Sequence, residues 1–236
     1  MKAMVNKDKV DEYNEVLERL NPAEILYWLT MQDAGSITMT SSFQAQSLPL
    51  LYMVSRICPA VPVLFLDTGY HFKETLDYVD ELQSLLNLDL VRITPLVVVE
   101  DEKMPWSNPD MCCYLRKVEP LQNELKKYDV WISGIRRDQT AVRKQVKILD
   151  YDSKNDVLKI CPMANFSRHM IEQVNAHLNL PFNPLRQQGY LSIGCEPCTE
   201  KSVCGDERSG RWGQSGKTEC GLHLPEEMYE KAKGKA

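Results

Sequence analysis

Eight cysteines are the residues whose chemistry stands out in this chain of 236 residues. Four of them form two pairs, one adjacent and one separated by two residues: Cys112, Cys113, Cys195 and Cys198. Four thiolates are the number that holds a tetrahedral Zn²⁺ or an iron–sulfur cluster. Adjacent cysteines cannot easily both reach one small ion at ~2.3 Å, whereas in a cubane each can bind a different iron. The donor set therefore favours a 4Fe–4S cluster over zinc.

The other cysteines divide by their surroundings. Cys58 and Cys161 lie among apolar residues and are expected to be buried small hydrophobes. Cys204 could compete as a ligand, but we prefer Cys198 because Cys-x-x-Cys closes a tight turn around a metal. Cys220 lies in a polar segment with Lys217 and His223 nearby. From chemistry alone it is either a reactive thiolate or an incidental exposed thiol.

Three polar loops form a second candidate site. The residues of 41–47, 67–72 and 134–140 each follow a predicted strand, and the carboxyl ends of parallel strands are where ligands bind in an open α/β sheet. Hydroxyls and free N–H groups at a helix start bind anions, and the adjacent Arg136 and Arg137 are phosphate ligands by geometry. The sequence therefore predicts a cleft for a nucleotide-like anion.

Strands and helices alternate along the part of the chain that must position these residues. Strands are predicted at 36–40, 61–67, 88–94 and 130–134, and helices at 48–57, 73–86 and 112–127. Asn21, Pro22 and Glu24 form a helix-start signature, and Gly35 is expected to close that helix in the left-handed conformation. A hairpin at 145–160, a helix at 167–178 and an irregular segment follow. The fold class is α/β, with a parallel sheet flanked by helices.

Composition excludes several classes of protein. Hydrophobic residues at 43% and charged residues at 26% are values of a globular chain, and the net charge of −5 provides no basic field for nucleic acid. The apolar runs fall far short of the ~18 residues of a membrane helix, and the first residues contain no apolar signal region. We therefore expect a soluble cytoplasmic protein without nucleic-acid or membrane partners.

Seven motifs together resemble the assimilatory adenylyl-sulfate reductases, in that family's order and spacing over roughly residues 36–224. They are Ser41-Ser42-Phe43, Leu66-Asp67-Thr68-Gly69, Cys112-Cys113-x-x-Arg116-Lys117-x-Glu119-Pro120-Leu121, Gly134-x-Arg136-Arg137-x-Gln139, Gly194-Cys195-Glu196-x-Cys198-Thr199, Gly210-Arg211-Trp212 and Glu219-Cys220-Gly221-Leu222-His223. The resemblance implies an adenine-nucleotide α-hydrolase-like fold of the PP-loop type. It also implies a nucleotide-binding domain over 1–198 and a mobile tail over 199–236.

The same resemblance implies a reaction. The two cysteine pairs would hold one 4Fe–4S cluster, and the thiolate of Cys220 would attack the sulfur of adenylyl sulfate. AMP would leave, and thioredoxin or glutaredoxin would release sulfite from the resulting S-sulfocysteine. Lys117 would lie beside the cluster and the substrate's sulfate, and His223 would belong to the catalytic element. The implied substrate-binding residues are Ser41, Ser42, Phe43, Asp67, Thr68, Gly69, Gly134, Arg136, Arg137, Arg208 and Arg211.

Other functions stay open beside this one. Gln46 in the first polar loop also resembles the cluster-free reductases of 3′-phosphoadenylyl sulfate, so that substrate is the alternative. An ATP pyrophosphatase or tRNA-thiolation enzyme shares the fold but needs a Ser-Gly-Gly-Lys-Asp-Ser loop, which 41–47 lacks. A zinc-ribbon interaction module would be colourless, whereas a cluster protein is brown. Whether copies of the chain form a homo-oligomer is left open.

Overall fold

The computed structural model describes residues 3–96, 103–203, 208–213, 217 and 219–223. Within those ranges, no helix has the length and apolar character needed to cross a membrane. The chain divides into two compact units. The first contains Met1–Phe65, Asp80–Val91 and Glu124–Pro181, and the second contains Leu66–Val79, Arg92–Asn123 and Phe182–Ala236.

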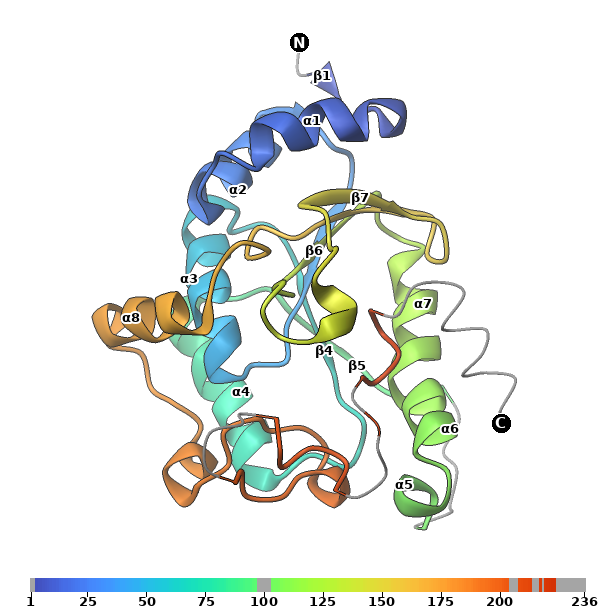
Figure 1. Ribbon diagram of the computed structural model, residues 1–236, viewed down its shortest axis with the longest axis vertical. Coiled ribbons are helices and arrows are strands. Elements are labelled where there is room, and N and C mark those ends of the chain that lie inside the picture. Colours follow the sequence, from blue (N-terminus) through green and yellow to red (C-terminus); the bar gives the residue numbers. More distant parts are fainter. Residues whose placement is uncertain (1–2, 97–102, 204–207, 214–216, 218, 224–236) are drawn as a thin grey trace. The chain divides into compact units, whose positions relative to one another are not determined.

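The longest run of paired strands is a six-stranded sheet, several strands of which are labelled in Figure 1; its strand order is β5-β4-β3-β6-β8-β7. The strands are β3 (Ile37–Thr40), β4 (Val63–Leu66), β5 (Leu90–Ile93), β6 (Val130–Ser133), β7 (Leu149–Asp152) and β8 (Val157–Ile160). Strand β3 pairs in parallel with β4 and β6, and β6 pairs in parallel with β8. Strand β7 is antiparallel to β8, which is the predicted hairpin. All four residues of β6 are buried, as expected for a central strand of a parallel sheet.

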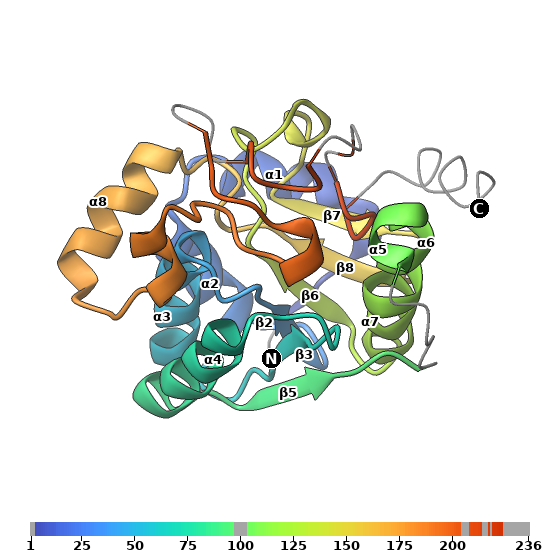
Figure 2. The same cartoon turned by 90° about the horizontal axis from the view of Figure 1, so that it is seen from below.

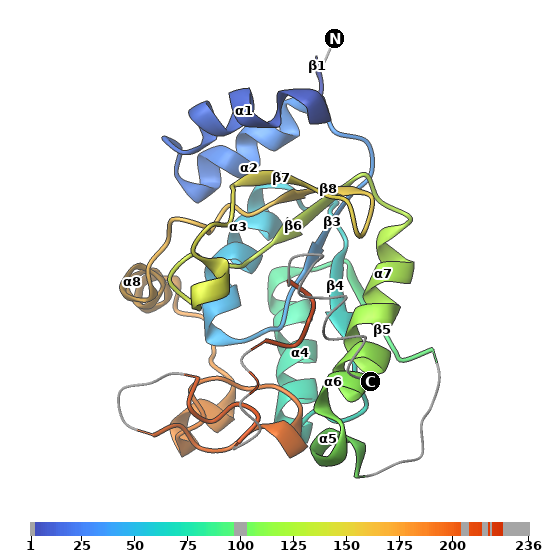
Figure 3. The ribbon, with the colours of Figure 1, turned by 45° about the vertical axis from the view of Figure 1, so that its right-hand side comes forward.

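Helices of the first unit pack around this sheet. They are α1 (Val10–Leu17), α2 (Pro22–Thr30), α3 (Leu48–Ile57) and α8 (Arg168–Leu178). Helix α1 contacts β7, and α3 contacts both α2 and α8. Figure 3 shows α1 and α2 side by side, joined by an edge-to-face contact between Tyr13 and Trp28 at 5.4 Å. A two-residue pairing of β1 (Ala3–Met4) with β2 (Gln32–Asp33) and three 3₁₀ turns complete the unit: η1 (Lys7–Lys9), η2 (Ala45–Ser47) and η4 (Ala141–Arg143).

The second unit is built from shorter elements. They are α5 (Met104–Ser107), α6 (Pro109–Cys113), a π-helical turn η3 (Tyr114–Val118), and two 3₁₀ turns, η5 (Pro184–Gln188) and η6 (Glu196–Cys198). Helix α5 lies against α6 and contacts η6 (Figure 2). Helices α4 (Lys73–Leu86) and α7 (Glu119–Leu125) continue from this unit into the first.

Local sequence signals predicted several elements to the residue. Helices α3 and α4 have the predicted bounds. The helix start at α2 is confirmed as a capping box: the Asn21 side chain accepts from the Glu24 N–H at 3.0 Å, and the Glu24 carboxylate accepts from the Asn21 N–H at 2.8 Å.

Two local predictions were wrong. Gly35 does have a left-handed φ of +65°, but α2 ends at Thr30 and β2 intervenes, so Gly35 caps no helix. Cys112 and Cys113 do not open their helix either. Asn108 caps α6 and Pro109 begins it, so the two cysteines lie at the end of α6, where the helix continues as a π turn. Their charge environment must therefore come from side chains rather than from a helix N-terminus.

Candidate functional site

The first cysteine pair and a lysine come from one continuous helical stretch of the second unit. The Asn108 side chain accepts from the Met111 N–H at 3.1 Å and so fixes the start of α6. Cys112 and Cys113 follow and are each 6% exposed. Lys117 lies four residues after Cys113, in the π turn, so the lysine and the cysteine are neighbours along the helix.

The second cysteine pair lies in a tight turn. The Cys198 N–H donates to the Cys195 carbonyl at 3.0 Å, and the Thr199 hydroxyl donates to the same carbonyl at 2.8 Å. The Trp212 N–H donates to the Cys198 carbonyl at 2.9 Å, which attaches the chain around residue 212 to this turn. As predicted, the Cys-x-x-Cys spacing closes a compact loop.

The loop after β4 supports the cysteines directly. Thr68 is fully buried, and its hydroxyl lies 3.2 Å from the Cys195 sulfur. Arg116 donates to the Thr68 carbonyl at 2.9 Å and stacks on the Tyr70 ring at 4.1 Å. Asp67 accepts from the Gly69 N–H at 3.1 Å and holds the loop in its turn. The side chain of Thr68, predicted to bind substrate, therefore contacts a cysteine.

The four cysteines act on one another electrostatically. Burial, followed by the neighbouring Cys113, Cys195 and Cys198, raises the pKa of Cys112 to about 12. Burial also raises the pKa of Cys113, and it raises that of Cys198 to about 11. Although burial opposes it, the charge of Lys117 and the Thr68 hydrogen bond hold the pKa of Cys195 below its usual value. All four are free thiols.

Three thiol groups act electrostatically on Lys117. Burial by itself would lower the pKa of this ammonium group, but Cys195, Cys113 and Cys220 together raise it above its usual range. The Lys117 ammonium also donates a hydrogen bond to Cys195. A permanent positive charge is therefore held where the predicted ligand cysteines and the predicted nucleophile come together.

The segment around Cys220 is tied to the same helical stretch. Lys217 forms an ion pair with Asp110 of α6. Gly221 has a φ of +94°, and a Cβ there would lie 3.3 Å from the Val118 side chain of η3. Cys220 and His223 are both half-buried. Cys220 thus lies within electrostatic reach of Lys117, while Lys217 is paired with a carboxylate.

The predicted tail arginines lie against a tryptophan. Arg211 and Arg208 stack on the Trp212 ring at 4.5 Å and 5.6 Å. A Cβ on Gly194 would lie 2.3 Å from an Arg211 nitrogen, so only glycine allows this close approach. Arg211 also acts on the pKa values of Cys195 and Lys117, which places its charge near the cysteines.

The polar loops of the first unit form their own network. Arg136 is only 2% exposed; it donates to Asp138 at 2.9 Å and to Gln46 at 3.0 Å. Gln139 donates to the same Gln46 oxygen at 2.8 Å. Gln46 therefore joins the loop after β3 to residues 134–140, which we call the arginine loop.

Arg137 points to a different set of partners. Its guanidinium donates to both carboxylate oxygens of Glu18, at 2.5 Å and 3.0 Å, and to the Val146 carbonyl at 2.7 Å. Binding a ligand phosphate through Arg137 would require breaking this ion pair. No local sequence signal pointed to Glu18, which is 119 residues away. Asp138 was also missed, although its place two residues after Arg136 was a usable signal.

Residues 41–47 follow β3, and we call them the serine loop; hydrogen bonds between its own residues stabilise it. The Ser41 hydroxyl accepts from the Phe43 N–H at 3.1 Å, and the Ser42 and Ser47 hydroxyls lie 3.2 Å apart. Phe43 has a φ of +52° and is 1% exposed, packed edge-to-face on Phe65. Of the three predicted binding residues here, only Ser42 is exposed.

The remaining cysteines follow the predictions as far as the structure describes them. Cys58 and Cys161 are buried, and burial raises the pKa of each to about 11. Cys204 lies outside the described residues.

Known proteins resemble this chain over most of its length. The model of the phosphoadenosine phosphosulfate reductase domain matches residues 36–201. An adenosine 5′-phosphosulfate reductase of Halalkalibacterium halodurans is 35% identical over 222 residues, which covers 91% of this chain and 96% of the relative. A protein of the same name from Streptomyces coelicolor is 36% identical over 214 residues, or 88% of this chain and 90% of the relative.

Solved structures show the same fold. The phosphoadenylyl-sulfate reductase of Candida auris, in a phosphate complex, has a TM-score of 0.72 and 25% identity, and the match covers 84% of this chain and 98% of that one. An FMN adenylyltransferase of Candida glabrata has a TM-score of 0.59 at 15% identity, and the match covers 97% of this chain and 85% of that one. From the match to the family model and the two bacterial relatives, we conclude that this chain belongs to the phosphoadenosine phosphosulfate reductase family.

Proposed function

We propose that this chain reduces adenylyl sulfate to sulfite and AMP in sulfate assimilation, with Cys220 as the nucleophile. The observation that carries the proposal is that Lys117 lies within electrostatic reach of Cys220 and of two of the predicted cluster ligands. Curated relatives that match most of the chain, named adenosine 5′-phosphosulfate reductase, support this substrate.

The proposed reaction has two steps. The Cys220 thiolate attacks the sulfur of adenylyl sulfate, the bond from that sulfur to the phosphate oxygen breaks, and AMP leaves with the electron pair. One thiol of a dithiol reductant then attacks the Cys220 sulfur and releases sulfite. The second thiol resolves the mixed disulfide, so the reductant becomes a disulfide and Cys220 is restored. We assign the reductant to thioredoxin or glutaredoxin and the reaction to the cytoplasm.

Lys117 supports the first step electrostatically. Negative charge builds up on the departing phosphate oxygen and on the transferred sulfo group as AMP leaves. A fixed ammonium group at a half-buried position stabilises such charge more than water does. Arg208 and Arg211, which stack on Trp212, are proposed to add positive charge for the sulfate group, and His223 belongs to the same catalytic element.

The cysteines fit a 4Fe–4S cluster. Four free thiols lie within electrostatic reach of one another, and the Cys195 sulfur is hydrogen-bonded to the Thr68 hydroxyl and to Lys117. The adjacent Cys112 and Cys113 cannot easily both reach a single Zn²⁺, whereas a cubane takes each thiolate on a different iron. When bound, the cluster would supply a local electrostatic field and a cross-link.

The arginine loop and the serine loop are proposed to bind the nucleotide. Arg136 and Gly134 lie in the first, and Ser41, Ser42 and Phe43 lie in the second. Asp67, Thr68 and Gly69, which belong to the second unit, are also proposed to bind the substrate; for Thr68 the role runs through Cys195. The specificity alternative is the 3′-phosphorylated substrate, because Gln46 lies in the serine loop. A kcat/KM ratio of about tenfold or more in its favour would establish that alternative.

A mass measurement tests the proposal. The anaerobically purified chain is incubated with adenylyl sulfate and no reductant, and its Cys220 peptide is expected to gain the mass of one SO₃ group while one AMP per site is released. Cys220→Ser is expected to retain iron and bind AMP but form no adduct, and Cys58→Ser serves as the matched control. An SO₃ group on Cys204, or sulfite production by Cys220→Ser, contradicts the assignment.

A further inference from the structure

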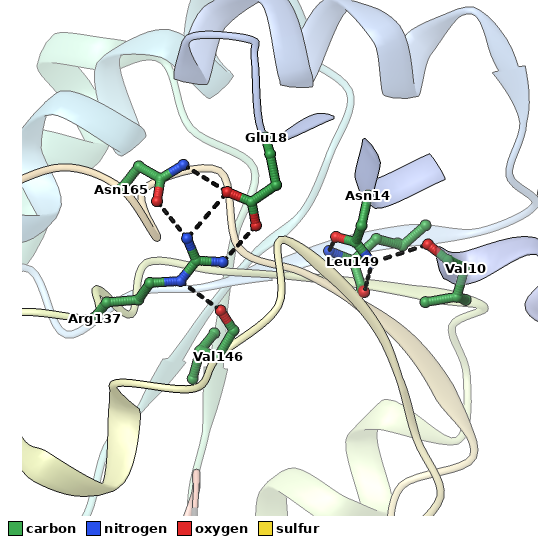
Figure 4. A network of polar contacts seen from close by, with 7 residues as sticks. All are labelled: Val10, Asn14, Glu18, Arg137, Val146, Leu149 and Asn165. Carbon is green, nitrogen blue, oxygen red and sulfur yellow. Dashed lines mark hydrogen bonds and ion pairs between the residues drawn. The ribbon is translucent and has the colours of Figure 1, made fainter. Parts of the chain in front are cut away.

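Glu18, the residue after the end of α1, is bound by the arginine loop (Figure 4). Its two carboxylate oxygens accept from the two terminal nitrogens of Arg137, at 2.5 Å and 3.0 Å. The Asn165 amide donates to the same carboxylate at 3.0 Å. A two-pronged contact between guanidinium and carboxylate is the strong form of this ion pair, and it fixes direction as well as distance. The contact lowers the pKa of Glu18, which keeps the carboxylate ionised.

Arg137 also donates to other acceptors. Its Nε donates to the Val146 carbonyl at 2.7 Å, and one terminal nitrogen donates to the Asn165 side chain as well. The Arg137 backbone N–H donates to the Ala164 carbonyl at 3.0 Å. Acceptors from three separate segments therefore hold this side chain in one orientation.

Arg136, the residue before Arg137, binds the serine loop. Arg136 is 2% exposed and donates to Asp138 and to Gln46. Gln46 belongs to the turn that begins α3 and follows Ser41 and Ser42. Arg137 binds Glu18 and Arg136 binds Gln46, and because the two arginines are adjacent in the chain, the peptide backbone between them connects the two sets of hydrogen bonds.

We propose that Glu18 is a positioning residue for nucleotide binding, acting through Arg137 on the arginine loop and the serine loop. The inference rests on the proposed function, because those loops are assigned there to the nucleotide. Glu18 lies before residues 36–201, the part that matches the family model. The N-terminal helix then contributes to the site without touching the substrate.

Helix α1 has a second attachment that does not involve Glu18. The Asn14 amide donates to the Leu149 carbonyl at 2.7 Å and accepts from the Leu149 N–H at 3.0 Å (Figure 4). Asp11 pairs with Lys147 at 2.8 Å. These contacts hold the helix on β7 when Glu18 is replaced. Positioning through Arg137 can therefore be separated from helix docking.

Three variants of the cluster-loaded full chain make this separation. Glu18→Gln removes the negative charge that pairs with Arg137, Asp11→Asn removes an exposed carboxylate from the same helix, and Asn14→Ala weakens docking without changing a partner of Arg137. For Glu18→Gln we expect KM for adenylyl sulfate and Kd for AMP to rise about 5-fold or more, with kcat within about twofold. Asp11→Asn and Asn14→Ala are expected to leave both constants within about twofold of the wild type.

A double variant tests the route through Arg137. If Glu18 acts through that side chain, Glu18→Gln adds nothing to Arg137→Gln, so the two changes are non-additive in AMP binding. Should Glu18→Gln fail to fold, Glu18→Asp, which keeps the charge and shortens the reach, takes its place. The inference is wrong if Glu18→Gln binds AMP as the wild type does, or if Asn14→Ala weakens AMP binding as much as Glu18→Gln does. It is also wrong if the effects of Glu18→Gln and Arg137→Gln on AMP binding add in the double variant. A wild-type chain that binds AMP but leaves adenylyl sulfate unreacted would instead refute the proposed function.

Discussion

At the scale of single residues, three thiol groups act on one ammonium group. Cys113, Cys195 and Cys220 all raise the pKa of Lys117, and Lys117 in turn lowers that of Cys195. Burial works against a charged lysine, and the three sulfurs act in the opposite direction and favour the charged form. The same ammonium group would face both the proposed nucleophile and the proposed cluster ligands.

Replacement of Lys117 by methionine keeps the length of the side chain and removes its charge. We expect kcat/KM for adenylyl sulfate to fall about 100-fold or more, because charge on the departing AMP is no longer stabilised. Lys117→Arg, which keeps the positive charge, is expected to recover part of the loss. Lys201→Met removes a lysine charge at an exposed position and is expected to leave kcat/KM at the wild-type value. Steady-state kinetics with iron content measured on the same samples checks this. A wild-type kcat/KM in Lys117→Met would remove Lys117 from the mechanism.

At the scale of elements, Gly35, which has a left-handed φ, lies at the contact that aligns strands β3 and β6. Gly35 precedes β3, and a Cβ there would lie 2.3 Å from a carboxylate oxygen of Asp129. That carboxylate accepts from the Ser36 N–H at 2.8 Å and from the Ser36 hydroxyl at 2.7 Å. The contact connects the start of β3 to the start of β6, and β3 ends at the serine loop. A glycine is required here by both the φ angle and the space.

Gly35→Ala tests this alignment. We expect the free energy of unfolding to fall by about 2–3 kcal/mol, from the left-handed φ and the displaced Asp129 carboxylate. Gly134→Ala is the matched control, because Gly134 has no left-handed φ and its Cβ would meet Leu50 at an ordinary 3.4 Å. Urea unfolding of both variants gives the comparison. Equal stability of Gly35→Ala and the wild type would show that the turn relaxes without cost.

At the scale of the whole molecule, the two cysteine pairs come from distant parts of the sequence but from the same compact unit. One pair lies on α6 and the other at η6. A cluster bound to all four would cross-link Arg92–Asn123 to Phe182–Ala236, so metal binding and folding of this unit are expected to be linked.

Loss of one ligand is therefore expected to affect iron, activity and stability together. Cys195→Ser should lose its iron, because a hydroxyl is a poor substitute for thiolate, and its Tm should fall by about 5 °C. Cys58→Ser and Cys204→Ser should retain full iron. Iron analysis, absorption near about 400 nm and thermal unfolding of anaerobic samples check these outcomes. Full iron in Cys195→Ser, or none in Cys204→Ser, would show that the ligand set is wrong.

The sequence by itself determined what depends on neighbours along the chain. The bounds of α3 and α4, the capping box at Asn21 and the alternation of strands and helices all follow from local periodicity and local hydrogen bonds. The family, too, could be recognised from motifs of a few residues each.

Only the tertiary structure decided which partners the charged and polar side chains have. Thr68 contacts Cys195 across 127 residues, and Arg137 pairs with Glu18 across 119. Two adjacent arginines with the same local sequence therefore point to different partners, one to Gln46 and one to Glu18. A guanidinium binds whichever acceptors the fold brings within hydrogen-bond distance, and spacing along the chain carries no information about those distances.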